Sequence, residues 1–204
     1  MENLKQVGEK AGDAAGFARG YLDYLCKLLK DLDADSVGRV AEELARARRE
    51  ERQVFIIGNG GSAATAMHMV NDLSLGCPPE DGKRFRAVSL TDNISVLTAL
   101  ANDCGYDKVF TIQLENGLKA GDVAVLISAS GNSPNVTAAA ELAKRKGAAT
   151  VGFVGFDGGD LARVCDIVVH VRTPQDEYGP VEDIHMVLDH LLTSYFKSRA
   201  ASDK

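Results

Sequence analysis

The chain has 204 residues, of which 45% are apolar, so it is long enough to bury a core and is expected to form one domain. Its formal net charge of −6 disfavours nonspecific attraction to nucleic acid or to an anionic membrane, and we predict neither partner. The absence of a membrane-length apolar stretch, of a signal-peptide pattern and of any Cys-x-x-Cys pair predicts a cytoplasmic protein with reduced thiols.

The first quarter of the chain is predicted to be helical. Between Asp13 and Glu51, apolar residues at intervals of three and four define two helices, and Asp35 or Ser36 is the expected cap between them. Their apolar faces pack either on the protein's own sheet or on another copy of the chain, and the pattern favours the two alternatives about equally. We assign residues 1–52 to these helices, with a role in oligomerisation, and residues 53–204 to a single sheet-containing unit.

Short apolar runs alternate with helical stretches beyond Glu51. Because parallel strands need crossover connections, this alternation predicts an α/β fold, a three-layer α/β/α sandwich with a five-stranded parallel sheet. Ligands of such sheets bind beyond the carboxyl ends of the strands. The expected strands are Gln53–Ile57, Phe85–Leu90, Asp122–Ser128, Ala149–Val154 and Asp166–Val171.

Two of the predicted strands end in loops that are suited to anions. The first strand enters the glycine-rich turn 58–62, where backbone N–H groups at a helix start can approach a negative ligand. The third strand enters the serine-rich loop 128–135, in which Ser133 is the expected N-cap and Pro134 the first helical residue. Either loop alone fits an ordinary strand-to-helix turn. Two of them at one sheet edge, both without Lys or Arg, predict a cation-free phosphate pocket.

Ionisable residues are concentrated on two of the predicted helices. His68 and Asp72 lie four residues apart, on one helix face, soon after the glycine-rich turn. Such pairs are commonly solvated surface pairs, but histidines and carboxylates together also suit zinc or a similar divalent ion. The pattern does not determine whether the two helices meet. The C-terminal helix, expected from Pro180 to about Ser198, adds Glu182 with His185 and Asp189 with His190.

These motifs resemble those of the sugar isomerase (SIS) domain family and, within it, the phosphoheptose isomerases. The resemblance implies a flavodoxin-like SIS fold and a homotetramer with active sites at subunit interfaces. It also implies an aldose–ketose isomerisation in heptose biosynthesis, from sedoheptulose 7-phosphate to D-glycero-D-manno-heptose 7-phosphate through an enediol. The shared segments, in the family's order and spacing, are Gly58–Ser62, Ala66–His68, Ala101–Asp103, Ile127–Ser133, Asp157–Gly159 and Glu182–His185.

The resemblance further implies roles for individual residues. It implies one Zn²⁺ or other divalent ion per subunit, with Asp72 and His190 as the catalytic pair that transfers protons. The implied metal ligands are His68, Asp72, Glu182 and His190. The implied substrate-binding residues are Asn59, Gly60, Gly61, Ser62, Asp72, Asn102, Asp103, Ser128, Ala129, Ser130, Ser133 and Glu182.

Two of these positions depart from the family pattern. Asp72 stands where glutamate is usual, which retracts the carboxylate by about 1.5 Å. Glu182 stands where glutamine is usual, which adds an anion. The shorter carboxylate of Asp72 can lower the rate by about 100-fold unless the site readjusts. With the added anion, the pattern as a whole favours metal binding, and the exact sugar stays open. Because eight residues of helix, about 12 Å, separate Glu182 from His190, His185 is an alternative ligand to either of them.

Two other functions compete with the isomerase. Some relatives in this family are non-catalytic phosphosugar-binding adaptors that associate with the bacterial replication initiator, and residues 91–93 and 97–103 resemble that branch. The branch lacks the equivalents of Asp72 and His190, which this chain retains, so the isomerase is favoured. A nucleotide-dependent oxidoreductase is disfavoured, because the turn 58–62 does not form Gly-x-Gly-x-x-Gly.

Overall fold

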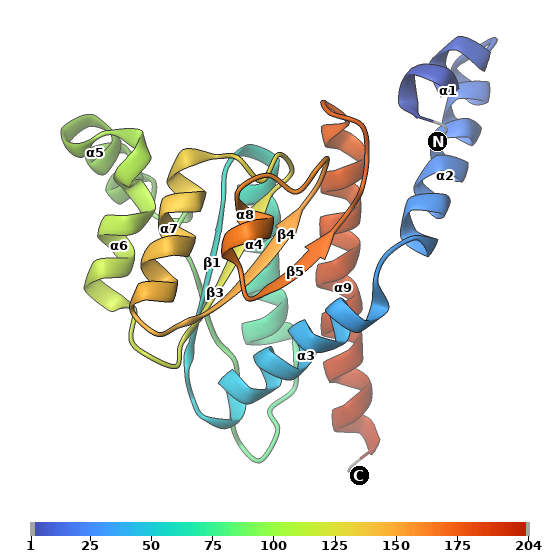
Figure 1. The fold of residues 1–204 in the computed structure, drawn as a ribbon. Helices are drawn as coiled ribbons and strands as arrows, with labels where there is room; N and C mark the ends of the chain where they lie inside the picture. The colour runs from blue at the N-terminus through green and yellow to red at the C-terminus, as the bar shows by residue number, and fades with distance from the viewer. Residues whose placement is uncertain (1–2, 203–204) are drawn as a thin grey trace.

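The computed structural model describes residues 3–202, which form one parallel five-stranded sheet with helices on both faces (Figure 1). The strand order is β2-β1-β3-β4-β5, with all pairs parallel. The predicted three-layer fold is therefore confirmed, and each predicted strand agrees with the observed one to within one residue at either end. The strands are β1 (Gln53–Gly58), β2 (Arg86–Ser89), β3 (Val123–Ser128), β4 (Ala149–Val154) and β5 (Ile167–His170).

Side chains of β1 alternate between two hydrophobic cores, one on each face of the sheet. Val54 and Ile56 pack into one core, whereas Phe55 and Ile57 pack into the other. None of the helices within residues 3–202 is both long and apolar enough to cross a membrane. The first core is covered by α3 (Ala34–Arg49), α4 (Gly60–Asn71) and α9 (Tyr178–Ser202), and the second by α6 (Val109–Gly117), α7 (Pro134–Arg145) and α8 (Leu161–Val164).

Within the part of the chain that the structure describes, three helices, not the predicted two, precede β1. The additional helix, α1 (Leu4–Lys10), has a capping box in which Asn3 and Gln6 cap each other's backbone, a sequence signal that the helical periodicity alone did not reveal. The second helix, α2 (Ala14–Lys30), is followed by α3. The cap of α3 is Asp33, which accepts a hydrogen bond from the backbone N–H of Asp35 at 3.0 Å, so the predicted cap at Asp35 or Ser36 was wrong by two or three residues.

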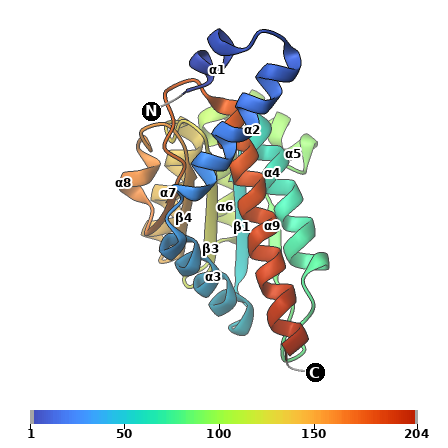
Figure 2. The same ribbon diagram turned by 90° about the vertical axis from the view of Figure 1, so that its right-hand side faces the viewer.

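A buried carboxylate anchors the N-terminal helices. Glu177, which directly precedes α9, accepts hydrogen bonds from the hydroxyl of Tyr24 at 2.5 Å and from the backbone N–H of Leu4 at 2.8 Å. Burial raises the pKa of the Tyr24 hydroxyl, and Glu177 adds to this, so the hydroxyl stays a donor. Figures 1 and 2 show α1 and α2 extending past the end of the sheet, beside the start of α9.

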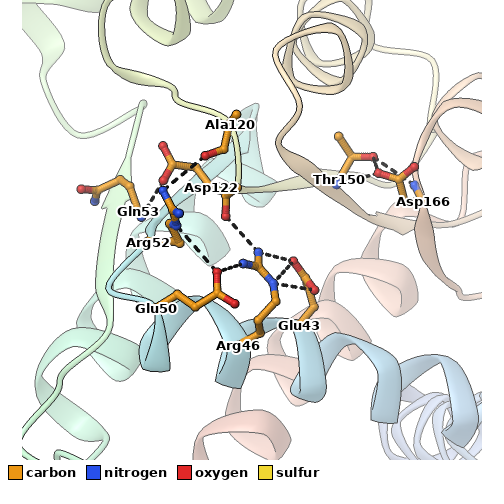
Figure 3. Close-up of polar contacts among 10 residues, drawn as sticks. Glu43, Arg46, Glu50, Arg52, Gln53, Ala120, Asp122, Thr150 and Asp166 are labelled. Carbon is orange, nitrogen blue, oxygen red and sulfur yellow. Dashed lines mark hydrogen bonds and ion pairs between the residues drawn. The ribbon is translucent and has the colours of Figure 1, made fainter.

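A polar network fastens α3 to the amino ends of the strands (Figure 3). The carboxylate of Asp122 accepts a hydrogen bond from the backbone N–H of Gln53 at 3.0 Å, which joins β1 to β3. Arg46 forms ion pairs with Glu43 and Glu50, both at 2.6 Å, and donates a hydrogen bond to the carbonyl of Gly121 at 2.9 Å. This edge of the sheet is thus held by structural contacts, whereas the carboxyl edge carries the two predicted anion loops.

Candidate active site

The loop after β3 gathers three serine hydroxyls. The Oγ atom of Ser128 lies 3.4 Å from that of Ser130 and 3.3 Å from that of Ser133, and it accepts a hydrogen bond from the backbone N–H of Gly131 at 3.1 Å. Ser133 takes the predicted N-cap position of α7, but its hydroxyl makes no capping hydrogen bond. The hydroxyls therefore gather at a helix N-terminus, an arrangement that suits a phosphate group.

The turn 157–159 supports this serine loop from behind. Gly131 has φ +64°, and a Cβ atom there would lie 2.1 Å from the carbonyl oxygen of Gly158. The backbone N–H of Leu161 donates to the carbonyl of Gly131 at 3.0 Å, and that of Gly155 donates to the carbonyl of Ala129 at 2.9 Å. The main chain of the serine loop is therefore fixed by close backbone packing, which only glycine at position 131 permits.

Asn59 joins the glycine-rich turn to the serine loop. Although it is the N-cap residue of α4, its side chain makes no capping hydrogen bond. It forms a reciprocal pair with the buried amide of Asn135, at 2.8 Å and 3.1 Å, and accepts a hydrogen bond from the hydroxyl of Tyr106 at 2.9 Å. Asn135 and Tyr106 were missed as site residues. The position of Asn135 in the first turn of α7 was the available signal for it.

Glu182 lies against the N-terminus of α4. A Cβ atom on Gly61 would meet the carboxylate of Glu182, so the end of this side chain lies directly against the first turn of α4. Burial raises the pKa of Glu182, and the neighbouring Asp183 acts in the same direction. Of the other residues in the turn, Gly60 is exposed and Ser62 is buried. The Glu182 carboxylate is therefore placed beside the predicted substrate loop.

Two histidines from α4 and α9 meet one another. The Nε2 atoms of His68 and His190 lie 3.1 Å apart, and their rings form a T-shaped pair with centroids at 5.1 Å. The Nε2 atom of His68 is 3.8 Å from a carboxylate oxygen of Asp72 and 3.9 Å from one of Asp189. One potential ligand atom from each of these four residues lies within 4.8 Å of the other three. Two imidazoles and two carboxylates form a donor set that could hold a divalent metal ion.

The cluster contains three of the four predicted metal ligands, His68, Asp72 and His190, but not Glu182. The helices α4 and α9 lie side by side (Figure 2) and touch at two levels, first where Gly61 meets Glu182 and then where His68 meets His190. These levels are seven to eight residues apart, or about 10 to 12 Å along each helix. The side chain of Glu182 cannot reach from the first level to the histidines of the same chain. Glu182 therefore stays beside Gly61, near the substrate loop.

Asn102 and Asp103 do not join this cluster. They lie on the exposed helix α5 (Ile94–Cys104), where the side-chain amide of Asn102 donates a hydrogen bond to Asp103 at 2.7 Å. Figure 1 shows α5 beyond α6 and α7, on the opposite side of the molecule from α9. Their contact with substrate stays a prediction.

His185, the alternative ligand, is fully buried and points elsewhere. Its ring packs beside Phe153 with centroids 5.9 Å apart, and it is not part of the four-residue cluster. Burial lowers its pKa from 6.5 to about 4, and the Val154 backbone offsets this in part. The structure therefore gives His185 a place in the core as a neutral side chain, and it does not support the alternative in which His185 binds the metal.

The neutral state of His185 should make the protein less stable in acid. Between pH 6.5 and about 4 the unfolded chain binds a proton at this position and the folded chain does not, so the free energy of unfolding should fall as the pH falls. A shift of this size corresponds to about 3 kcal/mol. Urea unfolding of the wild type and of His185→Phe at pH 7 and pH 4.5 isolates the contribution of His185 to the loss of stability, because the other titrating groups are common to both proteins. An equal loss of stability in the two proteins would contradict the prediction.

The chain is similar to known proteins in both sequence and structure. The family model for the SIS domain matches residues 20–155. A phosphoheptose isomerase of Pelobacter propionicus is 38% identical over 174 residues, which cover 84% of this chain and 89% of that protein. One from Nitratidesulfovibrio vulgaris is 40% identical over 167 residues, which cover 78% of this chain and 76% of its own.

A solved structure gives the same assignment. The phosphoheptose isomerase of Neisseria gonorrhoeae superposes with a TM-score of 0.79 at 29% sequence identity, over 89% of this chain and 97% of that one. The sequence and structure comparisons therefore agree on the family and on the fold. The chain belongs to the SIS domain family and, within it, to the phosphoheptose isomerases.

Proposed function

We propose that the protein isomerises a ketose phosphate to an aldose phosphate, with sedoheptulose 7-phosphate as substrate and D-glycero-D-manno-heptose 7-phosphate as product. The observation that carries this proposal is the meeting of His68, Asp72 and His190, which come from two helices far apart in the sequence. The names of the relatives support the same reaction. A non-catalytic phosphosugar-binding adaptor would have no need of this group of ionisable side chains.

The two loops at the carboxyl edge of the sheet are proposed to bind opposite ends of the substrate. The phosphate is held at the start of α7 by hydroxyls and backbone N–H groups of the serine loop, from Ser128, Ala129, Ser130 and Ser133. The sugar lies toward the glycine-rich turn, Asn59 to Ser62, and Glu182 accepts hydrogen bonds from its hydroxyls. Asn102 and Asp103 complete the proposed substrate-binding set.

Asp72 and His190 are proposed to transfer the protons. One of them, as a base, removes a proton from C1 of the ketose while the other, as an acid, protonates the carbonyl oxygen on C2, which gives a 1,2-enediol. Return of a proton to C2 and loss of the proton on the C1 oxygen then yield the aldehyde. Both side chains lie in the four-residue cluster, so they are close enough to act on neighbouring carbon atoms of one sugar.

The metal is proposed to be one Zn²⁺ per subunit, held by His68, Asp72 and His190. The donors fit, because the cluster combines imidazole nitrogens with carboxylate oxygens, and one of its carboxylates, Asp189, is fully buried next to the histidines. When bound, zinc can hold these side chains in place. A different divalent ion with a preference for nitrogen and oxygen ligands would satisfy the same residues.

The working unit is proposed to be a homotetramer with its active sites at subunit interfaces, in which residues 1–52 contribute to assembly. In support, large apolar side chains are exposed around the cluster, including Met67 at 43%, Leu191 at 46% and Tyr195 at 46%. An apolar groove of about 410 Å³ also runs between α3 and α9. A second copy of the chain would remove these surfaces from water. The cytoplasmic location remains a prediction from the sequence.

Hydrogen exchange in deuterated water tests the proposed reaction. Sedoheptulose 7-phosphate should incorporate deuterium at carbon when the metal-loaded protein is present, and aldose phosphate should accumulate. A panel of ketose phosphates of different length and stereochemistry then identifies the preferred sugar. Binding of phosphosugars without exchange or product, with metal present, would refute the isomerase and favour the adaptor.

A further inference from the structure

The environment of Asp189 is the least expected feature of the cluster. Its side chain has an exposed fraction of 0%, and neither carboxylate oxygen has a hydrogen-bond partner of normal geometry among the described residues. A buried carboxylate without compensation costs several kcal/mol, so proteins pair such groups or use them to bind metals. The carboxylate of Asp189 faces His68 and His190 and also the like charge of Asp72.

The charge of the four-residue cluster is balanced only when a cation is present. Two carboxylates and two neutral imidazoles carry a charge of about −2, which a divalent ion neutralises. If Glu182 were the fourth ligand, the buried carboxylate of Asp189 would still lack a partner.

The four donor atoms are close enough to one another to converge on a single metal ion. Ligand bonds of about 2.0 to 2.2 Å place neighbouring donors about 3.4 Å apart around zinc. The distances from the Nε2 atom of His68 to His190, Asp72 and Asp189 are 3.1, 3.8 and 3.9 Å. We propose that Asp189 is the fourth protein ligand of the metal in this chain and takes the place that the resemblance assigned to Glu182. The inference rests on the proposed metal site and specifies its composition.

The assignment leaves Glu182 free for the substrate. Its carboxylate lies beside Gly61, about 10 Å along α9 from Asp189, at the turn where sugar hydroxyls are proposed to bind. Asp189 and Glu182 then have separate roles, since Asp189 compensates the charge of the metal and Glu182 accepts hydrogen bonds from the sugar. Removal of one carboxylate should therefore change metal binding, and removal of the other should change substrate binding.

The matched variants Asp189→Asn and Glu182→Gln test this division, because each removes one charge and keeps the shape of the side chain. Binding of Zn²⁺ and Co²⁺ to chelator-treated protein is measured at pH 8 by titration calorimetry and by the visible spectrum of the cobalt form. Asp189→Asn should weaken metal binding by about 100-fold or more and alter the cobalt spectrum, whereas Glu182→Gln should leave both unchanged and raise the substrate KM.

Thermal unfolding gives a second readout that does not depend on activity. Without metal, Asp189→Asn should be more stable than the wild type, because it removes an uncompensated buried charge. With Zn²⁺, the order should reverse. Unchanged metal affinity in Asp189→Asn, or a loss in Glu182→Gln, would overturn the inference. A wild type that binds zinc through Asp189 but fails to exchange substrate protons would refute the proposed reaction and leave this metal site intact.

Discussion

Replacement of His190 by alanine is expected to lower the turnover of sedoheptulose 7-phosphate by about 10²- to 10⁴-fold, the usual contribution of a positioned acid–base group. The imidazole of His190 lies 3.1 Å from that of His68 and belongs to the cluster that the proposed reaction uses. Deuterium incorporation from the solvent into the sugar, followed by NMR, measures the effect directly. It should fall together with product formation, since both need the enediol.

The control for this variant is Ser194→Ala, an exposed position one turn farther along α9. It should keep full exchange, because it leaves the cluster intact. Both proteins are assayed with saturating zinc, and their metal content is measured, so that loss of the ion is separated from loss of the proton-transfer group. Full exchange by a metal-loaded His190→Ala protein would exclude His190 from proton transfer.

Substitution of Gly131 by alanine is expected to cost about 2 to 5 kcal/mol of folding free energy and to abolish phosphate binding. The left-handed backbone at φ +64° contributes about 1 to 2 kcal/mol. The clash of the new Cβ with the carbonyl of Gly158 at 2.1 Å adds about 1 to 3 kcal/mol, because backbone has to move. The movement displaces the serine hydroxyls. Urea unfolding and titration with inorganic phosphate measure the two effects.

Gly82→Ala separates the two contributions. Gly82 has φ +76°, but a Cβ atom there would meet nothing within 4 Å, so only the backbone strain of about 1 to 2 kcal/mol is expected. Phosphate binding should be unaffected. If both variants lose the same stability and both retain phosphate binding, the contact between Gly131 and Gly158 has no part in shaping the loop.

The sequence predicted the sheet well because local patterns determine it. Each strand is a short apolar run between turn residues, and the loops after β1 and β3 carry their glycines and serines at fixed offsets from the strand ends. Because β1 and β3 pair in parallel, both loops then lie at the same edge of the sheet. These features need no knowledge of which helices touch.

The cluster was predicted less completely because it depends on how two helices align. His68 and Asp72 share a face by spacing, but the residues opposite them depend on the stagger of α9 against α4. Asp189 did carry a local signal. It falls in helical step with Val181, His185 and Leu192, all of them buried, which predicts that this acid faces the core. Resemblance to the family favoured Glu182, and the stagger of the helices separates it from the histidines.

The reciprocal amide pair between Asn59 and Asn135 has a consequence for selectivity. It connects the first residues of α4 and α7, and Tyr106 supports it, so the spacing between the two ligand-binding loops is set before any ligand arrives. A fixed distance between the two loops selects sugar phosphates by the length of their carbon chain. A sugar phosphate of the matching length engages both loops together, whereas a shorter one has to give up the contacts at one of its ends.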